Sequence, residues 1–483
     1  MNLQPTILLF HKDLRLTDNL TLQAALNKEE PIIPLYIHST EKEKYPAGSA
    51  SKWWLHQSLY QLDAKLKQLG SRLILRKGDP FEILSEIISQ THAKNIYWSQ
   101  GFEPCEIAKE KKLKEKLSTL DVNVKTFNST LLFEPGRFKT KQGKPFQIFA
   151  FFWKALLQTK ECNPPLAAPK QLPRVPTTIL SDSLDSFNLE PSIDWTRGLK
   201  TMWQPGEEGG LIRLSHFIEN YLEKYEKTRD RPDLEGVSHL SAYLHFGEIS
   251  PRLVWHEVRK WMATQESAEA LSSAETFLKE LAWREFAYHL LYHFPHTIES
   301  PLDPAFNHFP WHDNASFFDA WTSGTTGYPI IDAGMRELWV TGWMHNRVRM
   351  IVASFLVKDL LIPWQKGSAW FWDTLVDADL ANNSMNWQWV AGCGADAAPY
   401  FRIFNPVVQG EKFDPDGTYI RRWIPELAKL DNHYIHKPWK APEIELKLAD
   451  IVLGINYPLP IVEHDKARIQ ALKAFEKIKS SVA

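Results

Sequence analysis

The sequence lacks the features that would place the chain in a membrane or outside the cell. It has no uncharged apolar run of about 18 residues or more, so no membrane-spanning helix is expected. Its start, MNLQPTILLF, has no basic region before a cleavable apolar run, which argues against secretion. Cysteine is scarce: Cys105, Cys162 and Cys393 are far apart and odd in number, which predicts reduced thiols in a cytoplasmic protein. They form no metal-ligand spacing with the histidines, so no metal site is expected.

The sequence also lacks a strong net charge and a glycine fingerprint. The formal net charge is −2, so any binding of nucleic acid would depend on a local basic surface. No GxGxxG follows the first predicted strand, which argues against a nicotinamide-dependent redox flavoenzyme. Tryptophan, by contrast, is abundant, with 20 residues. Most of these side chains must lie in cores, but those inside polar motifs need another explanation.

The first part of the chain alternates short apolar runs with helical patterns. Strands are predicted at 6–10, 32–38, 72–76, 95–99 and 122–127, and helices at 51–69, 80–90 and 104–120. This alternation predicts an α/β domain over residues 1–130 with a doubly wound, mostly parallel, Rossmann-like sheet.

The rest of the chain has a different pattern. Residues 131–205 are predicted to be an interdomain linker, because the stretch NPPLAAPKQLPRVP is rich in proline and weakly periodic. Long helical patterns then dominate, so residues 206–483 are predicted to form an all-helical second domain. A chain of 483 residues is too long for a single core, which agrees with such a division.

The densest chemistry lies between residues 342 and 409. The segments GWMHNRVRM, DADLANNSMNWQWVAG and APYFRIFNPVVQ alternate polar groups with tryptophans. Arginines beside tryptophans and amides suit an anion-bearing, planar ligand. For any one of these residues, a helical core with a polar network is the simpler interpretation. The whole constellation favours a ligand site.

These segments, with FHKDLRLTDN, WREF, TGYPIIDAGMREL and YPLPIVEH, resemble the DNA photolyase and cryptochrome family, in particular the class I photolyases that repair cyclobutane pyrimidine dimers. The resemblance implies an N-terminal antenna domain and a helical FAD-binding domain. It also implies light-driven DNA repair, in which an electron passes from photoexcited, reduced FAD to the dimer. The expected partner is DNA containing pyrimidine dimers, and the protein is expected to act as a monomer without an obligate protein partner.

The resemblance further implies a set of FAD contacts: Tyr225, Val237, Ser238, His239, Leu240, Ser241, Phe277, Glu280, Arg284, Arg349, Asp377, Asp379 and Asn383. Ser238 and Ser241 also suit ordinary helix capping. The two aspartates flanking Ala378 also suit a helix start, and Arg349 is their candidate partner.

At two of these positions, Asn383 and Val237, the chain can be compared with particular members of the family. Asn383 matches the residue that faces flavin N5, where an amide can both donate and accept a hydrogen bond. An aspartate at this place marks plant-type cryptochromes, so the asparagine favours repair over signalling. Val237 stands where the family often has threonine, and its side chain offers no hydroxyl.

The lesion pocket implied by the resemblance comprises Glu280, Trp283, Asn346, Arg347, Met350 and Trp389. On a helix, Glu280, Trp283 and Arg284 would share one face, as would Asn346 and Met350. A protonated carboxyl or an arginine would stabilise the pyrimidine anion, a role for Glu280 and Arg347. Relatives that repair (6–4) photoproducts carry histidines where this chain has Asn346 and Met350, which favours the cyclobutane dimer.

Contacts to DNA are expected from Arg229, Glu280, Trp283, Asn346, Arg347 and Gln409. Trp387, Trp364 and Trp311 match the family's electron-transfer triad, although any single tryptophan is more often part of a core.

The resemblance does not determine which antenna chromophore, if any, the first domain binds. Folate-binding relatives have an Asn-Glu pair and a lysine where this chain has Cys105-Glu106 and Glu299. Glu106 is therefore the one retained contact, and tight binding of methenyl-folate is not expected. A deazaflavin, flavin mononucleotide or no second chromophore stays open. A cryptochrome-like blue-light photoreceptor is the alternative function; such proteins often carry a long C-terminal extension.

Overall fold

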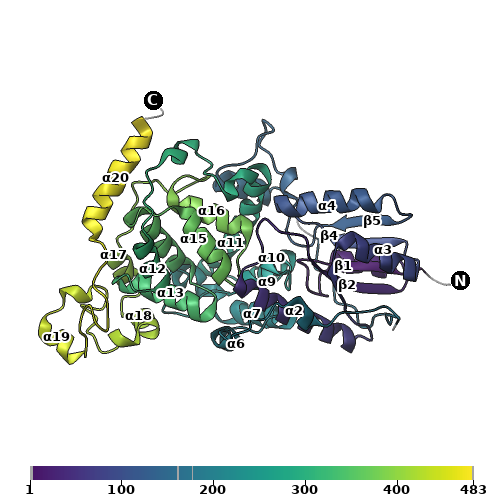
Figure 1. The fold of residues 1–483 in the computed structure, drawn as a ribbon, viewed down its shortest axis with the longest axis horizontal. Coiled ribbons are helices and arrows are strands. Elements are labelled where there is room, and N and C mark those ends of the chain that lie inside the picture. Colours follow the sequence, from purple (N-terminus) through teal and green to yellow (C-terminus); the bar gives the residue numbers. More distant parts are fainter. Residues whose placement is uncertain (1–3, 160–162, 177, 481–483) are drawn as a thin grey trace. The chain divides into compact units, whose positions relative to one another are not determined.

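The structure, a computed structural model, describes residues 4–159, 163–176 and 178–480 (Figure 1). Cys162 lies outside the described residues. The chain forms two compact units. The first unit comprises Met1–Glu223 and Ser238–His293, and the second unit comprises Lys224–Val237 and Phe294–Ala483. The chain therefore enters the second unit briefly and returns to the first, a division that a linear domain prediction does not contain.

A five-stranded parallel sheet forms the centre of the first unit. Its strands are β1 (Thr6–Phe10), β2 (Ile32–Ser39), β3 (Ile74–Gly78), β4 (Asn95–Ser99) and β5 (Asn123–Phe127). The order β3-β2-β1-β4-β5 makes β1 the neighbour of both β2 and β4, with Thr6 opposite Ile32 on one side and Asn95 on the other. All five predicted strands and the doubly wound fold are confirmed. In such sheets, ligands bind at the carboxyl ends of the strands where the winding reverses, here after β1 and β4.

Helices accompany the sheet and extend the first unit: α1 (Leu20–Leu26), α2 (Ser49–Gln68), α3 (Pro80–Thr91), α4 (Pro104–Leu117), α5 (Phe149–Leu157), α6 (Arg197–Met202), α7 (Glu207–Asn220), α9 (Ser241–His245), α10 (Pro251–Met262) and α11 (Ala268–His293). The predicted helices at 51–69, 80–90 and 104–120 are confirmed as α2, α3 and α4. The proline-rich segment predicted as a linker contributes to the core, because Val175 and Ile179 are buried in the cluster that includes Ile7 and Ile33.

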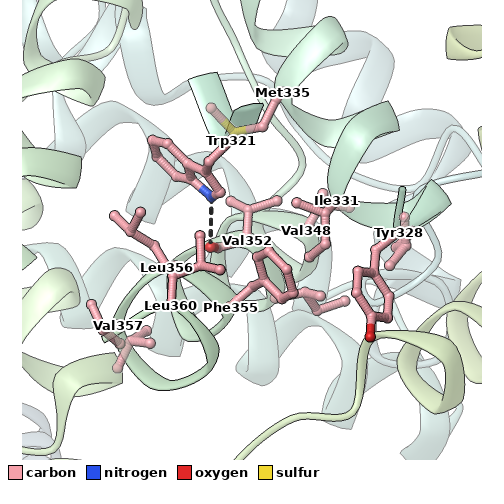
Figure 2. Close-up of a cluster of buried hydrophobic side chains, with 14 of the residues drawn as sticks. Trp321, Tyr328, Ile331, Met335, Val348, Val352, Phe355, Leu356, Val357 and Leu360 are labelled. Atoms are coloured by element: carbon pink, nitrogen blue, oxygen red, sulfur yellow. Dashed lines mark hydrogen bonds between the residues drawn. The ribbon is translucent and has the colours of Figure 1, made fainter. Parts of the chain in front are cut away.

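The second unit is helical in its described residues. Its helices are α8 (Tyr225–Thr228), α12 (Ala315–Ser323), α13 (Pro329–Thr341), α14 (Asn346–Ser354), α15 (Trp364–Thr374), α16 (Leu380–Ala391), α17 (Pro406–Phe413), α18 (Thr418–Trp423), α19 (Glu443–Leu448) and α20 (His464–Ser480), with a π-helical turn at Phe355–Asp359. Figure 2 shows part of its core, where the indole nitrogen of Trp321 donates to the carbonyl oxygen of Val352 at 3.0 Å. This bond ties α12 to α14, the helix that begins at the GWMHNR motif.

Candidate functional site

An ion pair in the second unit joins α14 to the segment before α16. Arg349 Nη2 lies 2.8 Å from Asp377 Oδ2, and Arg349 Nε donates to the carbonyl oxygen of Met344 at 2.7 Å. The pairing of Arg349 with this aspartate segment, predicted from the sequence, is confirmed. Asp377 Oδ1 is buried and has no hydrogen-bond partner within the described part of the chain. A buried acceptor without a donor is costly, so this oxygen fits a ligand that carries hydroxyl or N–H groups.

The residues that follow start α16 and limit what they offer a ligand. Asp379 caps the helix, and its Oδ1 accepts from the backbone N–H and the side-chain amide of Asn382 at 2.9 and 2.7 Å. The amide nitrogen of Asn383 donates to the carbonyl and hydroxyl oxygens of Ser368 at 3.0 and 2.9 Å. Both amide hydrogens of Asn383 are therefore used within the chain. Its carbonyl oxygen is the group that can meet a ligand, and it can only accept.

Helix α14 also carries three of the predicted lesion residues. Asn346 is exposed, and Arg347 and Met350 are half-buried. Arg347 Nη2 lies 2.6 Å from Asp230 Oδ2, and its guanidinium stands over the ring of Phe413 at 4.6 Å from the centroid. The cation is thus restrained by a carboxylate and an aromatic face before any ligand is present. Asp230 was not among the predicted site residues.

A buried polar group supports the start of α14. Glu337 Oε2 accepts from the Tyr419 hydroxyl at 2.6 Å and from the His345 backbone N–H at 3.3 Å. Burial raises the pKa of Glu337 to about 7, because the hydrogen bonds offset only part of the cost of desolvation. His345 caps the helix, with Nδ1 accepting from the Arg347 backbone N–H at 3.2 Å, and burial lowers its pKa to about 4. The imidazole is therefore neutral at pH 7. Sequence reasoning assigned no role to Glu337 or Tyr419.

The three predicted relay tryptophans belong to one hydrophobic cluster of the second unit. Trp364 and Trp387 are buried in it, and Trp311 and Trp389 pack against it while partly exposed. A side chain on Gly367 of α15 would overlap the Trp387 ring, so the indole rests directly on the helix backbone. Short distances between these tryptophans would suit electron transfer by short hops. Membership of one hydrophobic cluster suits an ordinary core equally well.

In the first unit, α11 carries Trp283 and Arg284 of the WREF motif, and these two side chains contact different parts of the chain. The rings of Trp283 and Phe149 stack with centroids 3.6 Å apart and planes at 8°. Arg284 is buried and donates to the carbonyl oxygens of Thr130 and Leu244 at 2.9 and 3.3 Å. Much of its donor capacity therefore serves the fold. Glu280 is half-buried on the same helix, and Phe277 packs against Phe217 with centroids 4.6 Å apart.

The predicted phosphate-binding stretch lies where the chain passes between the units. Tyr225, Arg229 and Val237 belong to the second unit, and Ser238, His239, Leu240 and Ser241 belong to the first. The Arg229 guanidinium stands over the Tyr225 ring at 5.4 Å from the centroid. Leu240 holds the N-cap position of α9 without a side-chain cap, and Ser241 is the first helical residue, so the capping interpretation of these serines is wrong. Ser238 Oγ accepts from the Leu240 N–H at 3.4 Å. Gln409 is half-buried on α17 of the second unit.

The predicted antenna residue Glu106 belongs to an ion cluster at the carboxyl ends of β1 and β4. Lys12 Nζ lies 2.6 Å from Glu103 Oε1 and 2.9 Å from Glu106 Oε1. Glu106 Oε2 accepts from the Glu103 backbone N–H at 3.2 Å, which completes a capping box at the start of α4. Both carboxylate oxygens of Glu106 are thus engaged within the chain. Cys105 is half-buried beside it, and Glu299 is an exposed residue of the second unit.

Neither a membrane-spanning helix nor a metal-binding cluster occurs among the described residues. Within the described ranges, no helix is both long and apolar enough to cross a membrane. Over the same ranges, no group of three or more histidine, cysteine or acidic side chains could hold a metal ion.

Comparison with known proteins extends the resemblance to the whole chain. Family models described as DNA photolyase and as the FAD binding domain of DNA photolyase match residues 6–172 and 277–477. The chain is 49% identical to a deoxyribodipyrimidine photo-lyase of Agrobacterium fabrum, covering 99% of this chain and 98% of that protein. It is 39% identical to Cryptochrome-1 of Arabidopsis thaliana, covering 98% of this chain and 70% of that protein.

A crystal structure of a bacterial class III photolyase from Agrobacterium tumefaciens matches with a TM-score of 0.95 and 48% identity, over 99% of this chain and 98% of that one. The sequence motifs predicted class I, whereas this similar structure is of class III, so the motifs do not decide the class. The predicted fold, a photo-lyase of this family and an FAD-binding domain are confirmed by these full-length matches. The chain belongs to the DNA photolyase family.

Proposed function

We propose that the protein is a light-driven lyase that uses FAD to split cyclobutane pyrimidine dimers in DNA. One observation carries the proposal: α14 holds the predicted lesion residues Asn346, Arg347 and Met350 on the same helix as Arg349, whose partner Asp377 keeps a buried acceptor without a donor among the described residues. A cofactor anchored through Arg349 would lie within one helix of the damaged bases. The proposal includes action as a monomer in the cytoplasm, as the sequence predicts.

The residues present fit FAD. Asp377 Oδ1 offers an acceptor for a ribityl hydroxyl or ring N–H, and Asn383 offers its carbonyl oxygen. We assign to the same cofactor Asp379 and Arg349, with Tyr225, Val237, Ser238, His239, Leu240, Ser241, Phe277, Glu280 and Arg284 as predicted from the sequence. When bound in its reduced form, FAD supplies the electron that light drives into the dimer.

The chain's own residues then hold the dimer and stabilise its charge. We assign to Arg347 and to Glu280 the stabilisation of the negative charge that develops on a pyrimidine carbonyl, as predicted from the sequence. Trp283 and Trp389 supply flat faces for an extruded dinucleotide; photolyases are a known case of base flipping. Phe149 covers one face of Trp283 at 3.6 Å, so a base would stack on the other face.

A cryptochrome-like photoreceptor is the second candidate, favoured by 39% identity to Cryptochrome-1 over 98% of this chain. Asn383 favours repair, because plant-type cryptochromes have an aspartate at this place. Both functions need FAD, so flavin content alone does not separate them. Repair of DNA does.

The test is light-dependent loss of dimers from irradiated DNA by the purified protein with its flavin reduced. We expect loss of dimers in blue light and none in the dark. Glu280→Ala should keep FAD bound and reducible but lower the repair yield per absorbed photon. No dimer loss from the wild-type protein, with flavin reduced and light absorbed, would favour the photoreceptor. An unchanged yield in Glu280→Ala would remove that residue from the mechanism.

A further inference from the structure

The carboxylate of Asp230 lies between two arginines that the sequence assigns to DNA binding. Its Oδ2 is 2.6 Å from Arg347 Nη2, and its Oδ1 is 4.0 Å from Arg229 Nε. All three residues belong to the second unit. One negative charge therefore offsets the charge of both cations in the absence of nucleic acid.

Arg347 keeps part of its donor capacity in this arrangement. Asp230 holds Nη2, and the ring of Phe413 supports the guanidinium plane. Arg347 Nε is buried and has no acceptor in the part of the chain that the structure describes. The planar fork is thus oriented but not saturated, as expected for an arginine that receives a further acceptor from a ligand.

Exposure distinguishes Asp230 from the other aspartates paired with arginines nearby. The side chains of Asp233, paired with Arg231, and Asp377, paired with Arg349, are 4% and 3% exposed. The side chain of Asp230 is 35% exposed. The Asp230 carboxylate is therefore open to solvent, whereas the other two are enclosed. The two buried aspartates are fixed partners, whereas Asp230 can be displaced.

We propose that Asp230 is a specificity-determining residue that lowers the affinity for undamaged DNA and orients Arg347 toward the lesion. This inference rests on the proposed function. A phosphate of undamaged DNA must compete with the carboxylate for Arg229 and Arg347, and it meets like-charge repulsion when it does. A dimer adds acceptors and stacking surface at the pocket, so damaged DNA overcomes this competition. Asp230 acts through the arginines and is a positioning residue, not a catalytic one.

The test compares dark binding of the full-length, FAD-containing protein to two duplexes of the same sequence, with and without one cyclobutane dimer, over a series of salt concentrations. Asp230→Asn preserves shape and removes the charge. We expect its affinity for the undamaged duplex to rise about three- to ten-fold at low salt, with the slope of log affinity against log salt steeper by about one. Affinity for the damaged duplex should rise less, so the ratio of the two affinities should fall. Asp230→Glu should restore the ratio.

Glu426→Gln is the matched control, because Glu426 pairs with Arg336 at 2.7 Å at similar exposure in the same unit. It should leave the ratio unchanged. An equal rise on both duplexes, or no change, in Asp230→Asn would overturn the inference while the wild type still prefers damaged DNA. A wild-type protein without that preference would contradict the proposed function itself, and the inference with it.

Discussion

Glu106 of the first unit and Asp377 of the second both match family positions and both pair with a cation, but they differ in what remains available. Glu106 uses one oxygen for Lys12 and the other for the Glu103 N–H. Asp377 uses one oxygen for Arg349, and its other oxygen is buried without a donor among the described residues. Glu106 is satisfied by the fold, whereas Asp377 is not.

The difference shows how to read a residue carried over from a family. A polar side chain with its hydrogen-bonding capacity used inside the chain has a sufficient explanation in the fold. A buried acceptor left open costs about 1–3 kcal/mol, a cost that a ligand donor removes on binding. By this criterion Asp377 keeps an acceptor for a ligand donor, whereas each oxygen of Glu106 already has a partner within the chain; the flavin role of Asp377 and the antenna role of Glu106 both stay predictions.

The largest expected effect is loss of FAD on substitution of Asp377, which substitution of Glu106 should not cause. Asp377→Ala removes the ligand acceptor and leaves Arg349 without its counter-ion, at a cost of about 3 kcal/mol. We expect the purified variant to lose most of its FAD, measured as flavin absorbance per chain after gel filtration. Asp377→Asn, which keeps the shape, should lose less. Glu106→Gln should retain full flavin, and equal flavin loss in both alanine and glutamine variants would remove the contrast.

The second prediction compares buried tryptophans in the two units. Trp387→Phe should block photoreduction of oxidised FAD, because phenylalanine is much harder to oxidise, yet leave repair by chemically reduced protein largely intact. The near match in volume limits the stability cost to about 1 kcal/mol. Trp98→Phe is the control: Trp98 is equally buried in the sheet core of the first unit. It should photoreduce normally. Normal photoreduction in Trp387→Phe would mean that electrons enter by another route.

The third prediction uses the opposite pKa shifts of two glutamates. The pKa of Glu337 is raised to about 7, so its contribution to stability is present below its ordinary pKa and lost as pH rises through 7. Glu337→Gln removes this titration. The free energy of unfolding of the variant minus that of wild type should therefore increase as pH rises from 5 to 8, by up to about 3 kcal/mol. Denaturant unfolding of both proteins at each pH measures this difference.

The pKa of Glu106 is shifted in the opposite direction. Burial alone would raise its pKa, but the Lys12 ammonium and the hydrogen bond from the Glu103 backbone N–H together outweigh burial and hold the pKa below its ordinary value. Its contribution is therefore present at neutral pH and lost as pH falls through the lowered pKa. Glu106→Gln should cost less than about 1 kcal/mol at pH 7, and the cost should shrink in acid. The same sign of pH dependence in both variants would contradict the contrast between the two sites.

The smallest expected effect is none at all. Because Glu106→Gln keeps the size of the side chain and one acceptor oxygen, and tight binding of methenyl-folate is not expected, the variant should leave any second chromophore unchanged. The check is the near-ultraviolet and visible absorption of wild-type and variant protein after reconstitution with excess methenyl-folate and gel filtration. A folate band retained by the wild type and lost in the variant would restore Glu106 as an antenna contact.

Sequence alone predicts those features that depend on local pattern. The strand–helix alternation of the sheet and the pairing of Arg349 with the aspartate segment follow from periodicity and a compact motif. Asp230 and Lys12 could not be found in this way, because their partners lie 117 and 91 residues away. Val175 and Ile179 were assigned to a linker because frequent prolines obscure the apolar pattern that buries them.

Gly367, against which the Trp387 ring packs, has a consequence for the rate of the proposed electron transfer. An indole that rests on the backbone of α15 at Gly367 has little room to tilt or shift. When such a ring loses or gains an electron, its surroundings change little in geometry, so the reorganisation energy of the transfer is small. For the proposed relay, this close packing favours electron transfer fast enough to compete with decay of the excited state. A larger residue at position 367 would displace the Trp387 ring and so slow the proposed transfer, although every indole of the relay would be kept.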